Sequence, residues 1–458
     1  MADVDDAAGT SAAEVAAEAC ERTLRLVGRG PDALVSAVVG ASSLTRFANS
    51  RIHQNVTEDV RAVSLTLAVG GRVAKASTSR TDPADLAALV ERARAAAALR
   101  PVDPDYAGFA PPAPVPPVAH WDDATAGATP DQRAAVVAAF VAAGAGLEAA
   151  GYCSTAGLHH ALASTTGQRA TARTSLAVLD GIHRAAVGRD HPADGYAQVS
   201  SVRLADLDGR ACGARAAAKA AAGLDPVSLP PGPYEVVLEP KAVAAMLLYP
   251  AYLGFNGKAH AEGTSFVHLG EAQWDTGLDL WDDALDPRVS GTAHDAEGTP
   301  KARLDLVRAG VSVGLAHDRR SARLAGVEPT GHSVGIGSFG GYPGNVFLGG
   351  GGATPEALVG GVERGLLVTD FWYNRVLDPK TQVVTGLTRN GLFLVEEGRI
   401  AGPVQNMRFT QSVVGGFGPG RVRGLGDDAR LVGSEGADLF HVPTVRLAQW
   451  AFTGNAQG

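Results

Sequence analysis

The sequence predicts an α+β fold, with an N-terminal and a middle helix–strand–helix domain and a C-terminal domain of mostly antiparallel β structure. Three observations predict this class. In each of the first two domains, alanine-rich helical patterns flank runs in which apolar and polar residues alternate, as in strands with one buried face. Two proline clusters, in 101–121 and 225–233, separate the domains. The remaining residues are rich in Gly, Val and Leu and contain few long helical patterns.

The N-terminal domain, 1–100, begins with a helix predicted over 11–28. Ser11 can cap this helix, Glu14 completes a capping box with it, and Gly28 can end it. The other predicted elements are strands over 35–39 and 60–69, a hairpin turn at Gly70-Gly71 and a helix over 83–99.

A linker is predicted over 101–121, which carries seven prolines, at 101, 104, 111, 112, 114, 116 and 117. Because proline fixes φ and has no backbone N–H, we expect this stretch to be extended and fairly stiff. The middle domain, 122–228, is predicted to contain a helix over 130–150, strands joined by glycine turns, and a helix over 202–222.

The C-terminal domain, 229–458, contains the strand-like runs YEVVLE, NVFLGG, GLFLVEEG and VPTVRLAQWAF. One helix is predicted over 354–368, with Thr354 as its cap and Pro355 in its first turn. A second helical run, MLLYPAYLGF at 246–255, is interrupted by Pro250, which removes a hydrogen bond and clashes with the preceding turn.

Charge and cysteine content argue against several classes of protein. A net charge of −8 without a dense Lys/Arg cluster argues against a nucleic-acid partner. No uncharged apolar run approaches the roughly 20 residues that span a bilayer, and the acidic N-terminus does not resemble a secretory signal. The three cysteines are far apart, which argues against a disulfide framework. We therefore expect a cytoplasmic protein with neither nucleic acid nor membrane as a partner.

The zinc-peptidase motifs HExxH and HExxxH are both missing from the sequence. In such motifs, one helix face carries two imidazoles, with a glutamate beside them as the base. The nearest cluster is His260, Glu262 and His268, whose spacing fits no standard helical ligand set. A hydrolase with a rewired site, built from these residues or from His441, is one alternative for the function.

Four stretches stand out together: LTRFANSRIHQN at 44–55, GTSF at 263–266, VERGLLVTDFWYNRVLDPKTQVVTG at 362–386, and FLVEEGRIAGPVQNMRFTQS at 393–412. In this combination the chain resembles, over nearly its whole length, the TldD/PmbA family of peptide- and protein-processing metallopeptidases. The resemblance implies a dimer of subunits built alike, either a heterodimer or a homodimer. It also implies an extended peptide substrate that pairs by strand addition.

The family's catalytic subunit carries HExxxH on a helix of its C-terminal domain, and a later cysteine completes the zinc site. On this sequence the first histidine falls on Tyr249, the glutamate on Pro250 and the second histidine on Gly254, and no cysteine occurs in 425–441. The resemblance is therefore closest to the PmbA/TldE-like subunit, which lacks the motif. It implies a non-catalytic subunit that binds no metal or other cofactor itself and pairs with a TldD-like subunit carrying the zinc. A non-enzymatic binding or scaffold protein is the second alternative.

Two sets of residues are candidates for contacts within such a complex. Residues that could bind the backbone of a peptide substrate are Arg46, Asn49, His53, Asn374 and Arg375. Aromatic residues are enriched at protein interfaces, which makes Phe371, Trp372 and Tyr373 candidates for the dimer contact. Loop hydrogen bonds and core packing are the structural alternatives for both sets.

Overall fold

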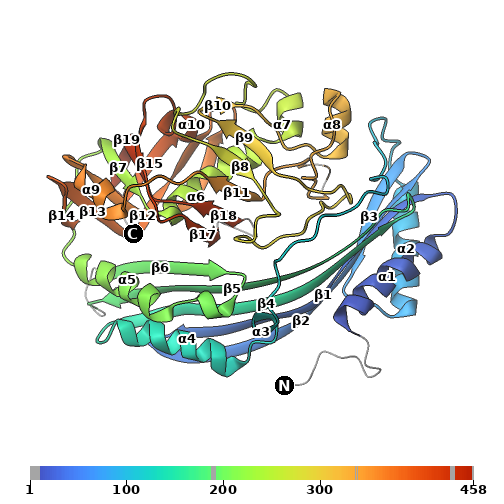
Figure 1. The fold of residues 1–458 in the computed structure, drawn as a ribbon, viewed down its shortest axis with the longest axis horizontal. Coiled ribbons are helices and arrows are strands. Elements are labelled where there is room, and N and C mark those ends of the chain that lie inside the picture. The colour runs from blue at the N-terminus through green and yellow to red at the C-terminus, as the bar shows by residue number, and fades with distance from the viewer. Residues whose placement is uncertain (1–10, 187–191, 336, 338, 434–438, 456–458) are drawn as a thin grey trace.

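The computed structural model describes residues 11–186, 192–335, 337, 339–433 and 439–455. Figure 1 shows two parts: a long curved sheet with helices on its outer side, and a β-rich C-terminal part above it. This arrangement confirms the α+β class that the sequence predicts. Within the described residues, no helix is both long enough and apolar enough to cross a membrane.

One antiparallel sheet contains the strands of both the N-terminal and the middle segments, in the order β3-β2-β1-β4-β5-β6. The two segments join through β1 and β4, where Leu34 pairs with Ser164 and Phe47 with Gly151. Four of the strands are unusually long. The bounds are β1 Asp32–Ala48, β2 Arg51–Val69, β3 Arg72–Thr78, β4 Glu148–Ser164, β5 Arg169–Ala185 and β6 Ala193–Ser201.

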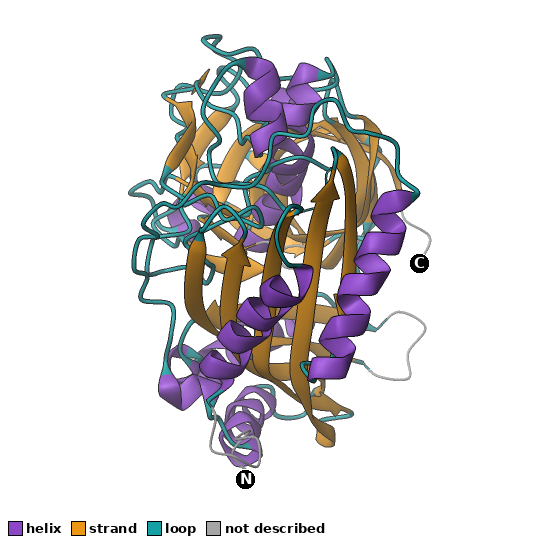
Figure 2. Cartoon of the chain, turned by 90° about the vertical axis from the view of Figure 1, so that its right-hand side faces the viewer, coloured by secondary structure: helices purple, strands orange, loops and turns teal. Residues whose placement is uncertain are grey.

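Helices cover the outer face of this sheet (Figure 2). The first, α1, spans Ala12–Val27, and its Ser11–Glu14 capping box and Gly28 end confirm the sequence prediction. Apolar side chains from α1, α2 and strands β1 to β4 form one core, and a second core lies under α4 and α5. The other bounds are α2 Pro83–Ala98, α3 Asp123–Ala126, α4 Pro130–Ala143, the 3-10 turn Leu204–Asp206 and α5 Gly209–Ala222.

Two helices of the middle segment are shorter than predicted. The helix expected over 130–150 ends at Ala143, because Gly144 and Gly146 (φ 88°) turn the chain into β4. The helix expected over 202–222 begins only at Gly209, where the side chain of Asp208 accepts a hydrogen bond from the backbone of Ala211.

The proline-rich segment 101–121 contains neither helix nor strand. Polar contacts hold it against the C-terminal part. Arg320 forms ion pairs with Asp103 (2.8 Å) and Asp105 (3.0 Å). The buried His120 ring lies 2.8 Å and 3.0 Å from two carbonyl oxygens of the segment 286–291. The linker is therefore held in place on the surface of the C-terminal part and is not a freely moving connection.

The C-terminal part contains a closed barrel of five strands, β12-β7-β19-β15-β13, because β13 also pairs with β12. The pairs are antiparallel except β7 with β12. Strands β14 and β16 extend the barrel from β13 and β19. The bounds are β7 Gly232–Leu238, β12 Arg364–Asp378, β13 Val383–Glu396, β14 Arg399–Pro403, β15 Met407–Ser412, β16 Val422–Leu425 and β19 Val445–Asn455.

A second sheet of short strands, in the order β10-β9-β8-β11-β18-β17, lies beside the barrel. Helix α6, Pro240–Tyr249, packs among residues of both, in the largest core of the molecule. The remaining bounds are α7 Gly257–Ala261, β8 Leu280–Asp282, β9 Leu304–Arg308, β10 Val311–Ser312, α8 Arg319–Ala325, β11 Asn345–Leu348, α9 Pro355–Gly360, α10 Val413–Gly416, β17 Arg430–Gly433 and β18 Leu439–Val442.

The helix predicted over 354–368 is wrong in its second half. Helix α9 ends at Gly360, and the run from Arg364 onward is strand β12. This strand pairs on one side with β7 and on the other with β13. Both neighbours lie far away in sequence, and their pairing outweighs the local helical pattern.

Candidate functional site

The segment MLLYPAYLGF forms the end of α6 and the turn that follows it. The helical path does not stop at Pro250. It continues as one π-helical turn, Pro250–Gly254, in which the Phe255 N–H donates to the Pro250 carbonyl at 2.7 Å. Proline has no N–H of its own, so a wider turn accommodates it without ending the helical path. The expected interruption at Pro250 is therefore a local widening of the helix.

This turn does not fit a zinc ion. Proline and glycine offer no ligand at 250 and 254. The Pro250 side chain lines a small apolar cavity together with Leu247 and Phe255. A side chain at 254 would overlap the ring of Phe266, which itself packs against Phe255 and Trp274. Across the described residues, no three His, Cys, Asp or Glu side chains are grouped so that they could hold a metal ion.

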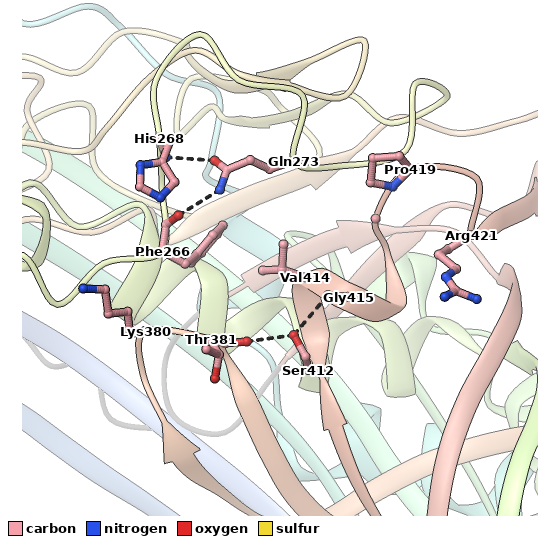
Figure 3. A pocket seen from close by; sticks show the side chains of 11 residues that line it. Phe266, His268, Gln273, Lys380, Thr381, Ser412, Val414, Gly415, Pro419 and Arg421 are labelled. Carbon is pink, nitrogen blue, oxygen red and sulfur yellow. Dashed lines mark hydrogen bonds between the residues drawn. The ribbon is translucent and has the colours of Figure 1, made fainter.

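A surface pocket of about 350 Å³ lies next to this turn, because Phe266 borders both. Figure 3 shows its walls: the loop 266–273, the turn at Lys380 and Thr381, and the stretch 412–421. Hydrogen bonds fix these walls. Gln273 bonds the backbone of both Phe266 and His268 at 2.8 Å, and the Ser412 hydroxyl donates to the Thr381 carbonyl at 2.7 Å.

The chemistry of the pocket favours binding over bond cleavage. His268, Lys380 and Arg421 supply hydrogen-bond donors, while Phe266 and Val414 supply apolar surface. None of the described side chains that line it is a carboxylate, so it contains no acidic general base. Such a pocket can bind a polar or anionic segment of an extended chain.

The residues of the alternative rewired hydrolase are not assembled into one site. His260 is exposed on α7, and Glu262 forms an ion pair with Lys258 at 2.7 Å. His441 lies on β18, where its ring stacks on Phe347 at 5.2 Å and burial lowers its pKa. His268 alone reaches the pocket.

The predicted peptide contacts lie in two places. Arg46, Asn49 and His53 are exposed on the β1–β2 hairpin, with Asn49 (φ 49°) in its turn. Asn374 and Arg375 lie on β12, where the Asn374 side chain is only 3% exposed and Arg375 is exposed. Their role in binding a peptide stays a prediction.

The aromatic run on β12 divides between the core and the surface. Phe371 is buried, with its ring 4.5 Å from that of Phe409 and 5.5 Å from that of Trp450. Trp372 is 39% and Tyr373 62% exposed, and the Arg389 guanidinium lies 4.7 Å from the Trp372 ring. Only the last two aromatic residues are therefore accessible to another molecule.

Sequence reasoning missed a buried polar cluster between the long sheet and the barrel. Asp370 is 4% exposed, and burial raises its pKa to about 7, with partial compensation by Lys241. Tyr196 donates to Asp180 at 2.7 Å, and burial raises the pKa of that carboxyl too. The one feature of the sequence that could have indicated this cluster is Asp370, an aspartate inside the apolar run LLVTDF.

Comparisons with known proteins agree with this fold. The family model for PmbA/TldA metallopeptidase domain 1 matches residues 33–97, and that for the PmbA/TldA metallopeptidase C-terminal domain matches residues 231–454.

Among solved structures, TldE from Thermococcus kodakarensis superposes with a TM-score of 0.82 at 17% identity, covering 95% of this chain and 99% of its own. A proposed modulator of a DNA gyrase from Thermotoga maritima gives 0.81 at 18%, with the same coverage. Another from Bacteroides thetaiotaomicron gives 0.81 at 20%, covering 96% of this chain and 98% of its own. Since both family models match in chain order on this fold, the chain belongs to the PmbA/TldD metallopeptidase family.

Proposed function

We propose that the chain is a non-catalytic, TldE/PmbA-like subunit of a zinc metallopeptidase complex that processes or degrades peptides. The observation that supports this proposal most strongly is the chemistry of the turn 249–254, to which the resemblance aligns the zinc motif of the family's catalytic subunit. Tyr249, Pro250 and Gly254 stand where two histidines and a glutamate are expected, and the Phe266 ring occupies the space that a side chain at 254 would need. A zinc ion that activates water would then have to come from a TldD-like partner subunit.

The neighbouring pocket supports a role in holding peptide. Its donors, His268, Lys380 and Arg421, suit carbonyl or carboxylate groups, and its fixed walls lower the entropy cost of binding. A subunit with these features completes a binding surface while the chemistry occurs in its partner.

Metal content and peptidase activity of the purified chain test this proposal. After incubation with zinc and desalting, we expect far less than one zinc ion per chain by elemental analysis. We also expect no cleavage of an unstructured peptide by the chain alone. Adding a TldD-type subunit that carries HExxxH should give cleavage, and omitting this chain should reduce it. About one tightly bound zinc per chain, or cleavage by the chain alone, would contradict the proposal.

A further inference from the structure

The polar side chains in the walls of the pocket in Figure 3 divide into two classes. The neutral ones bind the walls themselves: Gln273 bonds two backbone groups of the loop 266–273 at 2.8 Å. The Ser412 hydroxyl donates to the Thr381 carbonyl at 2.7 Å and accepts from a backbone N–H at 3.1 Å. The Thr381 hydroxyl donates to Asp378 at 2.6 Å. These groups shape the pocket and leave little hydrogen-bonding capacity for a ligand.

The basic side chains of the walls lack such partners. Lys380 and Arg421 line the pocket together with His268. Among the described residues, none of these three forms an ion pair, and neither the Lys380 ammonium nor the His268 ring makes a hydrogen bond. Arg421 uses one nitrogen, which donates to Gln449 at 3.2 Å. Because arginine has five N–H donors, most of its capacity is also unused.

The acidic residues close in sequence to these walls do not line the pocket. They are Glu271, Asp275 and Asp378. Asp275 accepts two backbone N–H groups, and Asp378 accepts one backbone N–H and one hydroxyl. Because hydrogen bonds between charged groups are the strongest that unused basic donors can make, the pocket favours an anionic ligand over a neutral or cationic one.

The basic and the apolar side chains occupy different parts of the pocket. Figure 3 shows Lys380 and His268 at one end and Arg421 at the opposite end. Phe266 and Val414 lie between the two ends. An inorganic anion would use one end and leave the apolar surface uncovered. The volume of about 350 Å³ is near the lower limit for ligand pockets, roughly 300–1,000 Å³, so it suits the end of a peptide better than a long segment.

We propose that this pocket binds the carboxyl end of a peptide whose last residue is apolar. Such a residue has a carboxylate and an apolar side chain on the same α-carbon, which matches unused donors beside an apolar surface. Lys380 and His268 hold the carboxylate, and Phe266 and Val414 contact the last side chain. Arg421, at the other end, holds a preceding backbone carbonyl. This inference rests on the proposed function and names the part of the peptide that this subunit recognises.

Peptide binding by the full-length chain tests the proposal, measured by titration calorimetry with neither zinc nor a partner subunit present. The probe is an unstructured Gly/Ser peptide that ends in leucine, as the free acid or as the amide. We expect the free acid to bind at least about tenfold more tightly, because the amide has no charge to pair with the unused donors. Equal affinities, or no binding of either peptide at millimolar concentration, overturn the proposal.

Two further peptides separate the sources of the carboxylate and of the apolar contact. A leucine amide with an aspartate before the leucine should bind as weakly as the simple amide, and binding as tight as the free acid overturns recognition of the carboxyl end. A free acid that ends in serine should bind at least about threefold more weakly than the leucine acid, because it lacks the apolar side chain. Equal binding of the two acids contradicts the apolar contact.

The double variant His268→Ala/Lys380→Ala tests the residues that hold the carboxylate. Both side chains are exposed, so the fold should be preserved. The variant should bind the acid and the amide with affinities within about twofold of each other. The matched control is Arg423→Gln, which removes a positive charge from an exposed residue near Arg421 that does not line the pocket. The control should keep the preference for the acid. An equal loss in both variants overturns the proposal, because only the general charge of the surface would then matter.

These outcomes are distinct from those that test the proposed function. Zinc binding or peptide cleavage by the chain alone would contradict the non-catalytic role and would leave a measured preference for the free acid intact. Absence of that preference would contradict only the role assigned to the pocket.

Discussion

At the level of single residues, Gly254 and Phe266 show why a larger side chain does not fit at 254 unless the Phe266 ring moves. The Ser265 hydroxyl donates to the Gly254 carbonyl at 2.6 Å, which fixes the stretch 263–266 against the turn. Phe266 then lies where a side chain on residue 254 would project. The family resemblance points to Tyr249, Pro250 and Gly254, which stays a prediction. It could not point to the Phe266 ring, because the contact forms only when the loop 263–266 folds back onto the turn.

Gly254→Ala tests this packing. The new methyl group would overlap the Phe266 ring, and we expect a loss of about 1–3 kcal/mol in the free energy of unfolding, measured by urea denaturation. Phe266→Leu should recover part of that loss in the double variant, so the two effects should not add. Gly352→Ala is the control, since a methyl group there would meet nothing within 4 Å. Additive losses would show that the ring does not fill this space.

At the level of elements, the sequence predicted where helices occur, but it predicted their ends only where a local capping or turn signal marks them. The capping box at Ser11 and the turn at Gly70-Gly71 lie where the sequence placed them, because both depend on residues within one turn. The run after Gly361 was assigned to the wrong element. Its identity as a strand depends on β7 and β13, which no local pattern reveals.

Two glycines distinguish the strand from the predicted helix. In a helix over 354–368, alanine at either Gly360 or Gly365 would stabilise the protein by roughly 0.5–1 kcal/mol. On β12, a methyl group at 365 would overlap the Glu235 carbonyl and come within 2.8 Å of Val362. We therefore expect Gly365→Ala to lower the unfolding free energy by about 1–3 kcal/mol. Gly360→Ala, which meets nothing within 4 Å, should be neutral or stabilising in the same denaturation assay.

For the whole molecule, the sequence predicted the fold class but not how its parts join. The proline segment suggested a boundary between independent domains. In the structure, β1 and β4 on either side of that segment pair along most of their length, and the segment itself makes hydrogen bonds and ion pairs with the C-terminal part. Composition marks where regular structure stops, but it contains no information about which distant strands meet.

The buried cluster between the long sheet and the barrel predicts a pH dependence of stability. Asp370 has a folded pKa of about 7, against an ordinary value near 3.8. Between pH 4 and 7 the unfolded chain has released this proton and the folded chain keeps it. This group therefore makes stability fall as pH rises through that window. Below pH 4 and above pH 7 its contribution is constant.

Asp370→Asn removes the titration while preserving the shape of the side chain. We expect the variant's unfolding free energy, relative to wild type, to rise by about 2–4 kcal/mol from pH 4.5 to pH 7.5. The exposed Asp131→Asn should differ from wild type by less than about 0.5 kcal/mol at both values. If the unfolding free energy of Asp370→Asn differed from that of wild type by the same amount at both pH values, the raised pKa of Asp370 would be contradicted.

The pairing of β1 with β4 also sets an order of events during synthesis. Leu34 meets Ser164, so the inner edge of β1 has no partner until β4 has left the ribosome. At 5–20 residues per second, the stretch between them takes on the order of ten seconds to make. During that interval the backbone N–H and C=O groups along the inner edge of β1 have no strand partner. This open edge is therefore available for incorrect strand pairing before β4 is made and before the C-terminal barrel can close.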